Sequence, residues 1–145
     1  MQTTVRHLLE IKGYNIWSIS PNASVYEALR MMSMKDVGAL IVMEGDKMVG
    51  ILSERDYARK VVLVGKASRE TLVSEIMSSK VYSIHPDQTV EEAMDLMNRK
   101  RIRHVPVVED GDDTHVLGMI SIGDVVRAII YKQREEIKSL EEKVK

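Results

Sequence analysis

Two parts of the chain carry the same pattern of residues, and this internal repeat constrains the possible folds more than any other feature. Residues 16–21 (IWSISP) align with residues 81–86 (VYSIHP) at an offset of 65. Three additional residues then enter the second copy within the polar stretch 110–115, and residues 50–56 align with residues 118–124 at an offset of 68. Because loops tolerate insertions and packed elements do not, the pattern predicts two copies of one small fold.

Each copy predicts the element order β-α-β-β-α. A helix begins after the N-cap candidates Ser24 and Thr89, each of which is followed three residues later by a glutamate, as in a capping box. Apolar residues then recur at the i, i+3, i+4, i+7 spacing of one buried helical face. The other expected elements are first strands at 16–19 and 81–84, core strands at 39–43 and 105–108, hairpin partners at 48–52 and 116–120, and closing helices at 56–64 and 124–131.

These short apolar strands need cover on both faces, which sets the expected fold class. We expect an α/β (α+β) fold in which two β-α-β-β-α repeats pack about a pseudo-twofold axis. Repeat 1 with an N-terminal helix is placed at 1–66, and repeat 2 with a linker helix at 67–131. A charged C-terminal helix is placed at 132–145, and its apolar residues recur at near-heptad spacing. This helix could form a coiled-coil dimer, bind a partner, or be a solvated helix end.

Composition narrows the possible functions. Lys and Arg total 21 against 22 Asp and Glu, so the net charge of -1 gives no electrostatic reason for a nucleic-acid or membrane partner. The chain has no cysteine, which excludes disulfides, thiol nucleophiles and thiolate metal sites. No apolar run approaches the ~20 residues of a membrane span, and the N-terminus does not read as a signal peptide. We therefore expect a soluble, cytoplasmic protein.

The motif Gly-h-h-Ser-x-x-Asp, in which h is apolar, closes a strand and opens a helix in both copies. It contains Ser53 and Asp56 in copy 1, and Ser121 and Asp124 in copy 2. Unpaired N–H groups and the helix dipole favour an anion at such a junction, and an aspartate can accept hydrogen bonds from paired ribose hydroxyls. Ser-x-x-Asp is also a helix-capping arrangement, which explains both residues without a ligand.

Basic residues make the two copies unequal. Arg103 and His104 lead into the core strand of copy 2, where they could clamp a phosphate, whereas the matching positions of copy 1 are Gly38 and Ala39. A solvated helix end whose cations complement the carbonyl dipole is the structural alternative for this basic stretch. Arg55 and Arg59, one helical turn apart in copy 1, could also reach a phosphate, or could pair with Glu54 and other surface acids. We expect two unequal clefts, of which the second is better suited to anions.

The sequence offers little for catalysis. The four histidines lack a metal-ligand spacing such as H-E-x-x-H, and neither a G-x-S-x-G elbow nor a P-loop is present. We therefore expect no enzyme activity and no metal site. Trp17 and Tyr82 occupy matching positions on the first strands, where each could stack on a purine or pack in the core.

These residues make the chain resemble the tandem cystathionine-β-synthase (CBS) domain family, whose paired unit is often called a Bateman module. The resemblance covers about residues 5–131 and is carried by GILSERD at 50–56, GMISIGD at 118–124 and RHVPV at 103–107. It implies that AMP, ADP, ATP, NAD(H) or S-adenosylmethionine binds in one or both clefts between the repeats. It also implies a homodimer and, because no target domain is attached here, a regulated protein partner in trans.

The resemblance further implies which residues contact the ligand. The motif aspartates hold the ribose, the motif serines contact ribose or phosphate, and the first strand of copy 2 meets the base. The implied contact residues are Ile19, Gly38, Ala39, Ser53, Arg55, Asp56, Lys80, Val81, Tyr82, Ile84, Arg103, His104, Val105, Pro106, Ser121, Ile122 and Asp124. We therefore expect an adenine-nucleotide sensor, AMP being the leading ligand. The alternative is a structural or interaction module whose clefts bind nothing.

Overall fold

The structure is a computed structural model that describes residues 3–109, 112 and 114–144. The turn expected at 110–113 lies outside the described residues except for Asp112. The described residues form two compact units. Unit 1 comprises residues 3–14, 83–109 and 117–144, and unit 2 comprises residues 15–82, 112 and 114–116.

Unit 2 contains a three-stranded sheet in the order β1-β2-β3. β1 (Ser18–Ile19) pairs parallel with β2 (Ala39–Glu44), and β2 pairs antiparallel with β3 (Lys47–Ser53). The helices of unit 2 are α2 (Val25–Lys35), α3 (Glu54–Tyr57), which continues into a π-helical segment (Ala58–Val62), and α4 (Val73–Ile76). The core consists of Val25, Ala28, Met32, Leu40, Val42, Leu52, Val61, Val73 and Ile76.

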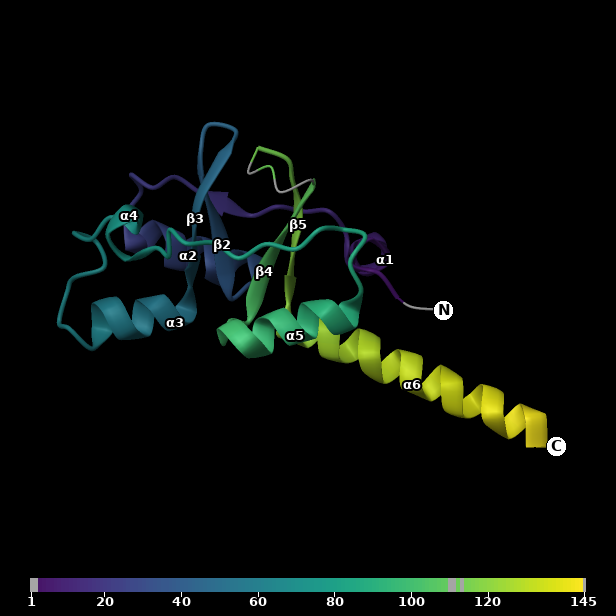
Figure 1. The fold of residues 1–145 in the computed structure, drawn as a ribbon. Coiled ribbons are helices and arrows are strands. Elements are labelled where there is room, and N and C mark those ends of the chain that lie inside the picture. The colour runs from purple at the N-terminus through teal and green to yellow at the C-terminus, as the bar shows by residue number, and fades with distance from the viewer. Residues whose placement is uncertain (1–2, 110–111, 113, 145) are drawn as a thin grey trace. The chain divides into compact units, whose positions relative to one another are not determined.

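Unit 1 contains the two-stranded sheet β4-β5, with β4 at His104–Val108 and β5 at Val116–Ser121. Its helices are α1 (Val5–Lys12), α5 (Val90–Lys100) and α6 (Ile122–Val144). The first part of α6 contacts α5, and α1 contacts both helices (Figure 1). The core consists of Val5, Leu8, Leu9, Ile84, Val90, Ala93, Met97, Val105, Val107, Ile120 and Val125.

The expected β-α-β-β-α order is present in copy 1, and copy 2 has the same order except that its first strand is reduced to one bridge. The capping residues lie where the spacing places them. The Ser24 and Thr89 hydroxyls accept the backbone N–H of the glutamates three residues later, at 3.1 Å in each case. The first strands are shorter than expected, however. Copy 1 keeps only Ser18–Ile19, and copy 2 keeps a single parallel bridge from Ile84 to Val107. These segments lie at a sheet edge, where few of their backbone groups find a partner strand.

The closing helices also differ from the expected ranges. In copy 1 the helix begins at Glu54, and its second half is π-helical. In copy 2 the helix continues without a break from Ile122 to Val144, so residues 132–144 extend α6 and do not form a separate element. No glycine or proline lies between residues 124 and 144 to stop it. No helix in the described residues is long and apolar enough to cross a membrane.

The compact units exchange the segments that lead into the two sequence copies. α1 precedes copy 1 but packs in unit 1, where the Val5 N–H donates to the Gln88 carbonyl at 2.8 Å. α4 precedes copy 2 but packs in unit 2, where the Val73 N–H donates to the Ala23 carbonyl at 2.9 Å. The expected boundaries at 1–66 and 67–131 therefore follow the order of the copies in the chain, whereas each compact unit takes the leading helix of the other copy.

This exchange explains the glycine of each motif. A Cβ atom on Gly50 would lie 2.7 Å from the Met77 sulfur and 3.0 Å from the Ser78 carbonyl oxygen, just after α4. A Cβ atom on Gly118 would lie 3.0 Å from the Leu9 side chain on α1. Each glycine therefore leaves room for the leading segment that crosses its strand.

Candidate functional site

The Ser-x-x-Asp sequence forms a reciprocal cap at the strand–helix junction of each unit. In unit 2 the Asp56 N–H donates to Ser53 Oγ at 3.2 Å, and the Ser53 N–H and Oγ–H both donate to Asp56 Oδ2 at 3.0 Å. In unit 1 the Asp124 N–H donates to Ser121 Oγ at 3.2 Å, and the Ser121 N–H donates to Asp124 Oδ2 at 2.8 Å. The capping interpretation of the motif is thus correct in both copies.

A backbone hydrogen bond ties each junction to the start of the neighbouring core strand. The Ile122 N–H donates to the Arg103 carbonyl at 2.8 Å, and the matching Glu54 N–H donates to the Gly38 carbonyl at 3.1 Å. In unit 1, Ile84 pairs with β4 further along that strand, through hydrogen bonds with the carbonyl of Pro106 and the N–H of Val108. In each unit, the strand–helix junction is therefore hydrogen-bonded to the residue just before the core strand, although the two are far apart in the sequence.

The expected contact residues divide between the units. Unit 1 holds Ile84, Arg103, His104, Val105, Pro106, Ser121, Ile122 and Asp124. Unit 2 holds Ile19, Gly38, Ala39, Ser53, Arg55, Asp56, Lys80, Val81 and Tyr82. In unit 2 the Lys80 ammonium lies 5.7 Å from the centroid of the Tyr82 ring, and the Lys35 ammonium lies 4.4 Å from that of Trp17. Trp17 also packs against the core of its unit.

The Asp124 carboxylate of unit 1 binds two cations in addition to its cap. Lys12 Nζ, at the end of α1, donates to Asp124 Oδ2 at 2.7 Å and to the Met119 carbonyl at 2.7 Å. Arg127, one turn along α6, donates to Asp124 Oδ1 at 2.7 Å. The Asp124 side chain is 11% exposed, whereas Lys12 is 40% and Arg127 72% exposed. A largely buried carboxylate thus contacts two cations that solvent still reaches.

Ionisation in this cluster reflects the same contacts. Burial by itself raises the pKa of Asp124, but the hydrogen bonds from Lys12 and Ser121 and the Lys12 charge outweigh burial and lower the pKa below its ordinary value. Burial lowers the pKa of His104, and the positive charges of Lys12 and Arg103 lower it further, against the opposing effect of Asp124. The cluster therefore favours an ionised aspartate beside a neutral histidine.

Unit 2 repeats this arrangement with a different lysine. Lys60 Nζ lies 3.3 Å from Asp56 Oδ1 and donates to the Ile76 carbonyl at 2.9 Å. Each motif aspartate thus faces a lysine that is also anchored on a backbone carbonyl. In unit 1 the lysine comes from the leading helix, and in unit 2 it comes from the closing helix and reaches the leading helix.

Sequence reasoning missed Lys12 and Lys60 as neighbours of the motif aspartates, and left Arg127 unassigned. Lys60 and Arg127 lie four and three residues after their aspartates, so helical spacing could have found them. Lys12 lies 112 residues from Asp124 in the chain, and no local pattern predicts that contact.

At each of the two strand–helix junctions, the motif carboxylate can accept hydrogen bonds from hydroxyl groups. A carboxylate presents about four lone-pair sites and can accept both hydroxyls of a vicinal diol. Among the described residues, no group of three or more His, Cys, Asp or Glu side chains is placed to hold a metal ion.

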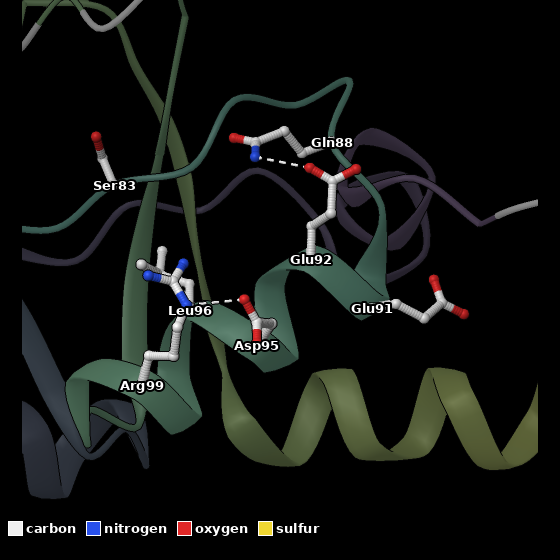
Figure 2. Close-up of a pocket in the computed structure, with 7 residues that line it drawn as sticks. All are labelled: Ser83, Gln88, Glu91, Glu92, Asp95, Leu96 and Arg99. Atoms are coloured by element: carbon white, nitrogen blue, oxygen red, sulfur yellow. Dashed lines mark hydrogen bonds and ion pairs between the residues drawn. The ribbon is translucent and has the colours of Figure 1, made fainter.

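A separate pocket of about 460 Å³ lies along α5 in unit 1 (Figure 2). Its lining consists of Ser83, Gln88, Glu91, Glu92, Asp95, Leu96 and Arg99, of which three are acidic and one is basic. Figure 2 shows two of its acids already engaged, Glu92 by Gln88 at 2.9 Å and Asp95 by Arg99 at 2.8 Å. None of the expected contact residues lines this pocket, and its three acidic side chains against one arginine disfavour a phosphate.

Comparison with known proteins gives the family. The CBS domain model matches residues 4–63 and 73–131. The mitochondrial CBS domain-containing protein CBSX3 of Arabidopsis thaliana is 38% identical over 95% of this chain and 70% of its own length. The structure of a CBS-domain protein from Burkholderia ambifaria superposes with a TM-score of 0.84 at 44% identity, covering 90% of this chain and 96% of that one.

A third comparison concerns a protein with bound ligands. The CBS domain pair of protein MJ0100, in complex with 5′-methylthioadenosine and S-adenosyl-L-methionine, superposes with a TM-score of 0.78 at 26% identity, covering 91% of this chain and 99% of that one. The two matched segments coincide with the two sequence copies, and the structures of the relatives share the mixed α+β architecture. The chain belongs to the CBS-domain family and carries a pair of CBS domains.

Proposed function

We propose that the chain binds an adenosine-containing ligand, AMP being the leading candidate, and that it acts as a regulatory module. Asp124 of unit 1 would accept hydrogen bonds from the ribose hydroxyls. The bound methylthioadenosine and S-adenosylmethionine of the MJ0100 domain pair support an adenosine ligand in general. The charge around Asp124 supports one that carries phosphate.

The observation that carries this proposal is the cation cluster at the start of α6. Asp124 accepts from Lys12 and Arg127. Arg103, whose carbonyl is tied to the same junction, immediately precedes β4, and His104 is the first residue of β4. A ribose diol would take over lone pairs of Asp124 that the two cations now occupy. The displaced ammonium and guanidinium groups would then lie beside the ligand, where a phosphate could receive them.

The proposed role is regulatory and not catalytic. A ligand changes the activity of a partner only through its different affinity for two arrangements of the chain. We propose that the partner is a separate protein acted on in trans, that the chain forms homodimers, and that it works in the cytoplasm. Neighbouring structures include a hexameric CBS-CP12 protein, which supports assembly as a property of such chains.

Isothermal titration calorimetry on the full-length, nucleotide-free chain tests the proposal. The titrants are AMP, ATP, NADH and S-adenosylmethionine. We expect micromolar binding of at least one, and a loss of about tenfold or more in Asp124→Asn, because a hydrogen bond to a charged group is worth about 1.5–3 kcal/mol. Asparagine keeps an acceptor for the Ser121 N–H, so the cap is retained.

Asp56→Asn is the matched control in unit 2. The sequence predicts that this change weakens binding less, because Gly38 and Ala39 stand where unit 1 has Arg103 and His104. Equal losses, or a larger loss in Asp56→Asn, would contradict the assignment of the ligand to Asp124.

A ligand-free interaction module is the second candidate. It is favoured by the saturation of both motif carboxylates, each of which already accepts from its cap and from a lysine. No heat with any of the four titrants, from a sample shown to be folded, would support this second function.

A further inference from the structure

We propose that the C-terminal part of α6, residues 132–144, pairs antiparallel with the same segment of a second copy of this chain. Figure 1 shows this part of α6 extending beyond α5, the helix against which its first part packs. Ile137, Leu140 and Val144 are 56%, 61% and 86% exposed. Three large aliphatic side chains on an otherwise polar segment leave apolar area in water, and burial of that area would stabilise a contact.

The exposed aliphatic residues share one face of the helix. Positions 126, 130, 133, 137, 140 and 144 follow alternating steps of four and three, the spacing of a coiled-coil seam, and only Gln133 is polar. A segment this short would not form a helix alone. Here it continues a helix that is already anchored in unit 1 by the fully buried Val125, so the cost of nucleation is met elsewhere.

The charges beside the seam argue against a parallel pair. In a parallel coiled coil the seam residues occupy heptad positions a and d, and a g residue of one helix faces the e residue of the next heptad in the other helix. This places Glu136 opposite Glu141 of the second copy, and the contact occurs twice by symmetry. Like charges in that position destabilise the pair.

An antiparallel pair reverses the sign of these contacts. With Ile137 opposite Leu140 of the second copy, Glu136 faces Lys143 and Arg134 faces Glu141, and each contact again occurs twice. Sliding the helices by one heptad would place Glu136 opposite Glu136 of the second copy, and Arg134 opposite Arg134. The charge pattern therefore selects both one orientation and one register.

Cysteine cross-linking of the full chain tests this geometry, because the natural sequence has no cysteine. In the proposed register residue 133 lies opposite residue 144 of the second copy. We expect the double variant Gln133→Cys/Val144→Cys to form a covalent dimer in a mild redox buffer. Each single variant should form no covalent dimer, because like positions are then separated by about 16 Å along the helix axis, beyond the ~7 Å limit of a disulfide. Cross-linking of the single variants as efficiently as the double would overturn the proposal.

A charge exchange gives an independent measurement by sedimentation equilibrium. Glu136→Lys and Lys143→Glu should each raise the dimer dissociation constant by about tenfold, because each converts two attractions into two repulsions. The double exchange Glu136→Lys/Lys143→Glu should restore the original constant. If the double exchange does not restore it, or if Leu140→Asp leaves it unchanged, the tail does not pair as proposed.

Discussion

The contact between Lys12 and Asp124 joins the first helix of unit 1 to its last, and its removal has a calculable cost. Lys12→Met keeps the length and the apolar stem of the side chain but removes the ammonium, with its two hydrogen bonds at 2.7 Å. A hydrogen bond to a charged group contributes about 1.5–3 kcal/mol when buried, whereas an exposed ion pair contributes about 0.2–1 kcal/mol. Because Lys12 is 40% exposed and Asp124 11% exposed, we expect a loss of about 1 kcal/mol at pH 7.

For a chain of this length, a loss of about 1 kcal/mol in unfolding free energy lowers the melting temperature by about 2–4 °C. Thermal denaturation followed by circular dichroism resolves a shift of that size. The pH dependence of the loss identifies its origin. The native contacts lower the pKa of Asp124, so their contribution is complete above the ordinary aspartate pKa of about 4 and is lost as pH falls through the lowered native value. The deficit of Lys12→Met relative to the natural chain should therefore shrink in acid.

Arg127→Met is the matched control for this prediction. Arg127 donates to the same carboxylate, but its side chain is 72% exposed, so its removal should lower the melting temperature by less. If Arg127→Met costs as much as Lys12→Met, burial of the contact is not the source of its strength. If the deficit of Lys12→Met is the same at pH 7 and in strong acid, the charge of Asp124 is not involved.

Three further predictions follow from the packing. Gly50→Ala should destabilise the chain more than Gly118→Ala in urea denaturation, because its new Cβ meets a backbone oxygen as well as a side chain; equal losses would contradict this. The imidazole of His104 should titrate below about 6.5 in NMR, and Lys12→Met should raise that midpoint; an unchanged midpoint would remove Lys12 as a cause. Deletion of residues 133–145 should leave nucleotide affinity unchanged in calorimetry, and a loss of binding would place the tail in the site.

Much of the local structure could be predicted from the residues because its causes are local. The capping residues Ser24 and Thr89 and the caps of both Ser-x-x-Asp motifs act within one helical turn, and the structure has them where the spacing places them. Strand lengths were predicted less well, because a strand ends where its partner ends, and the partner is not visible in the segment itself.

The internal repeat, the element order and the family are properties of the sequence by itself, since each depends on which residues follow one another. The exchange of leading helices between the units was decided only by tertiary packing, as was the placement of Lys12 on Asp124, across 112 residues of chain. The apolar face of α1 could be buried in either unit. Because the hydrophobic effect is non-directional, it does not specify which of the two units α1 packs in. The shape of the core beside Gly118 selects the unit, and with it the cation that faces the candidate ribose site.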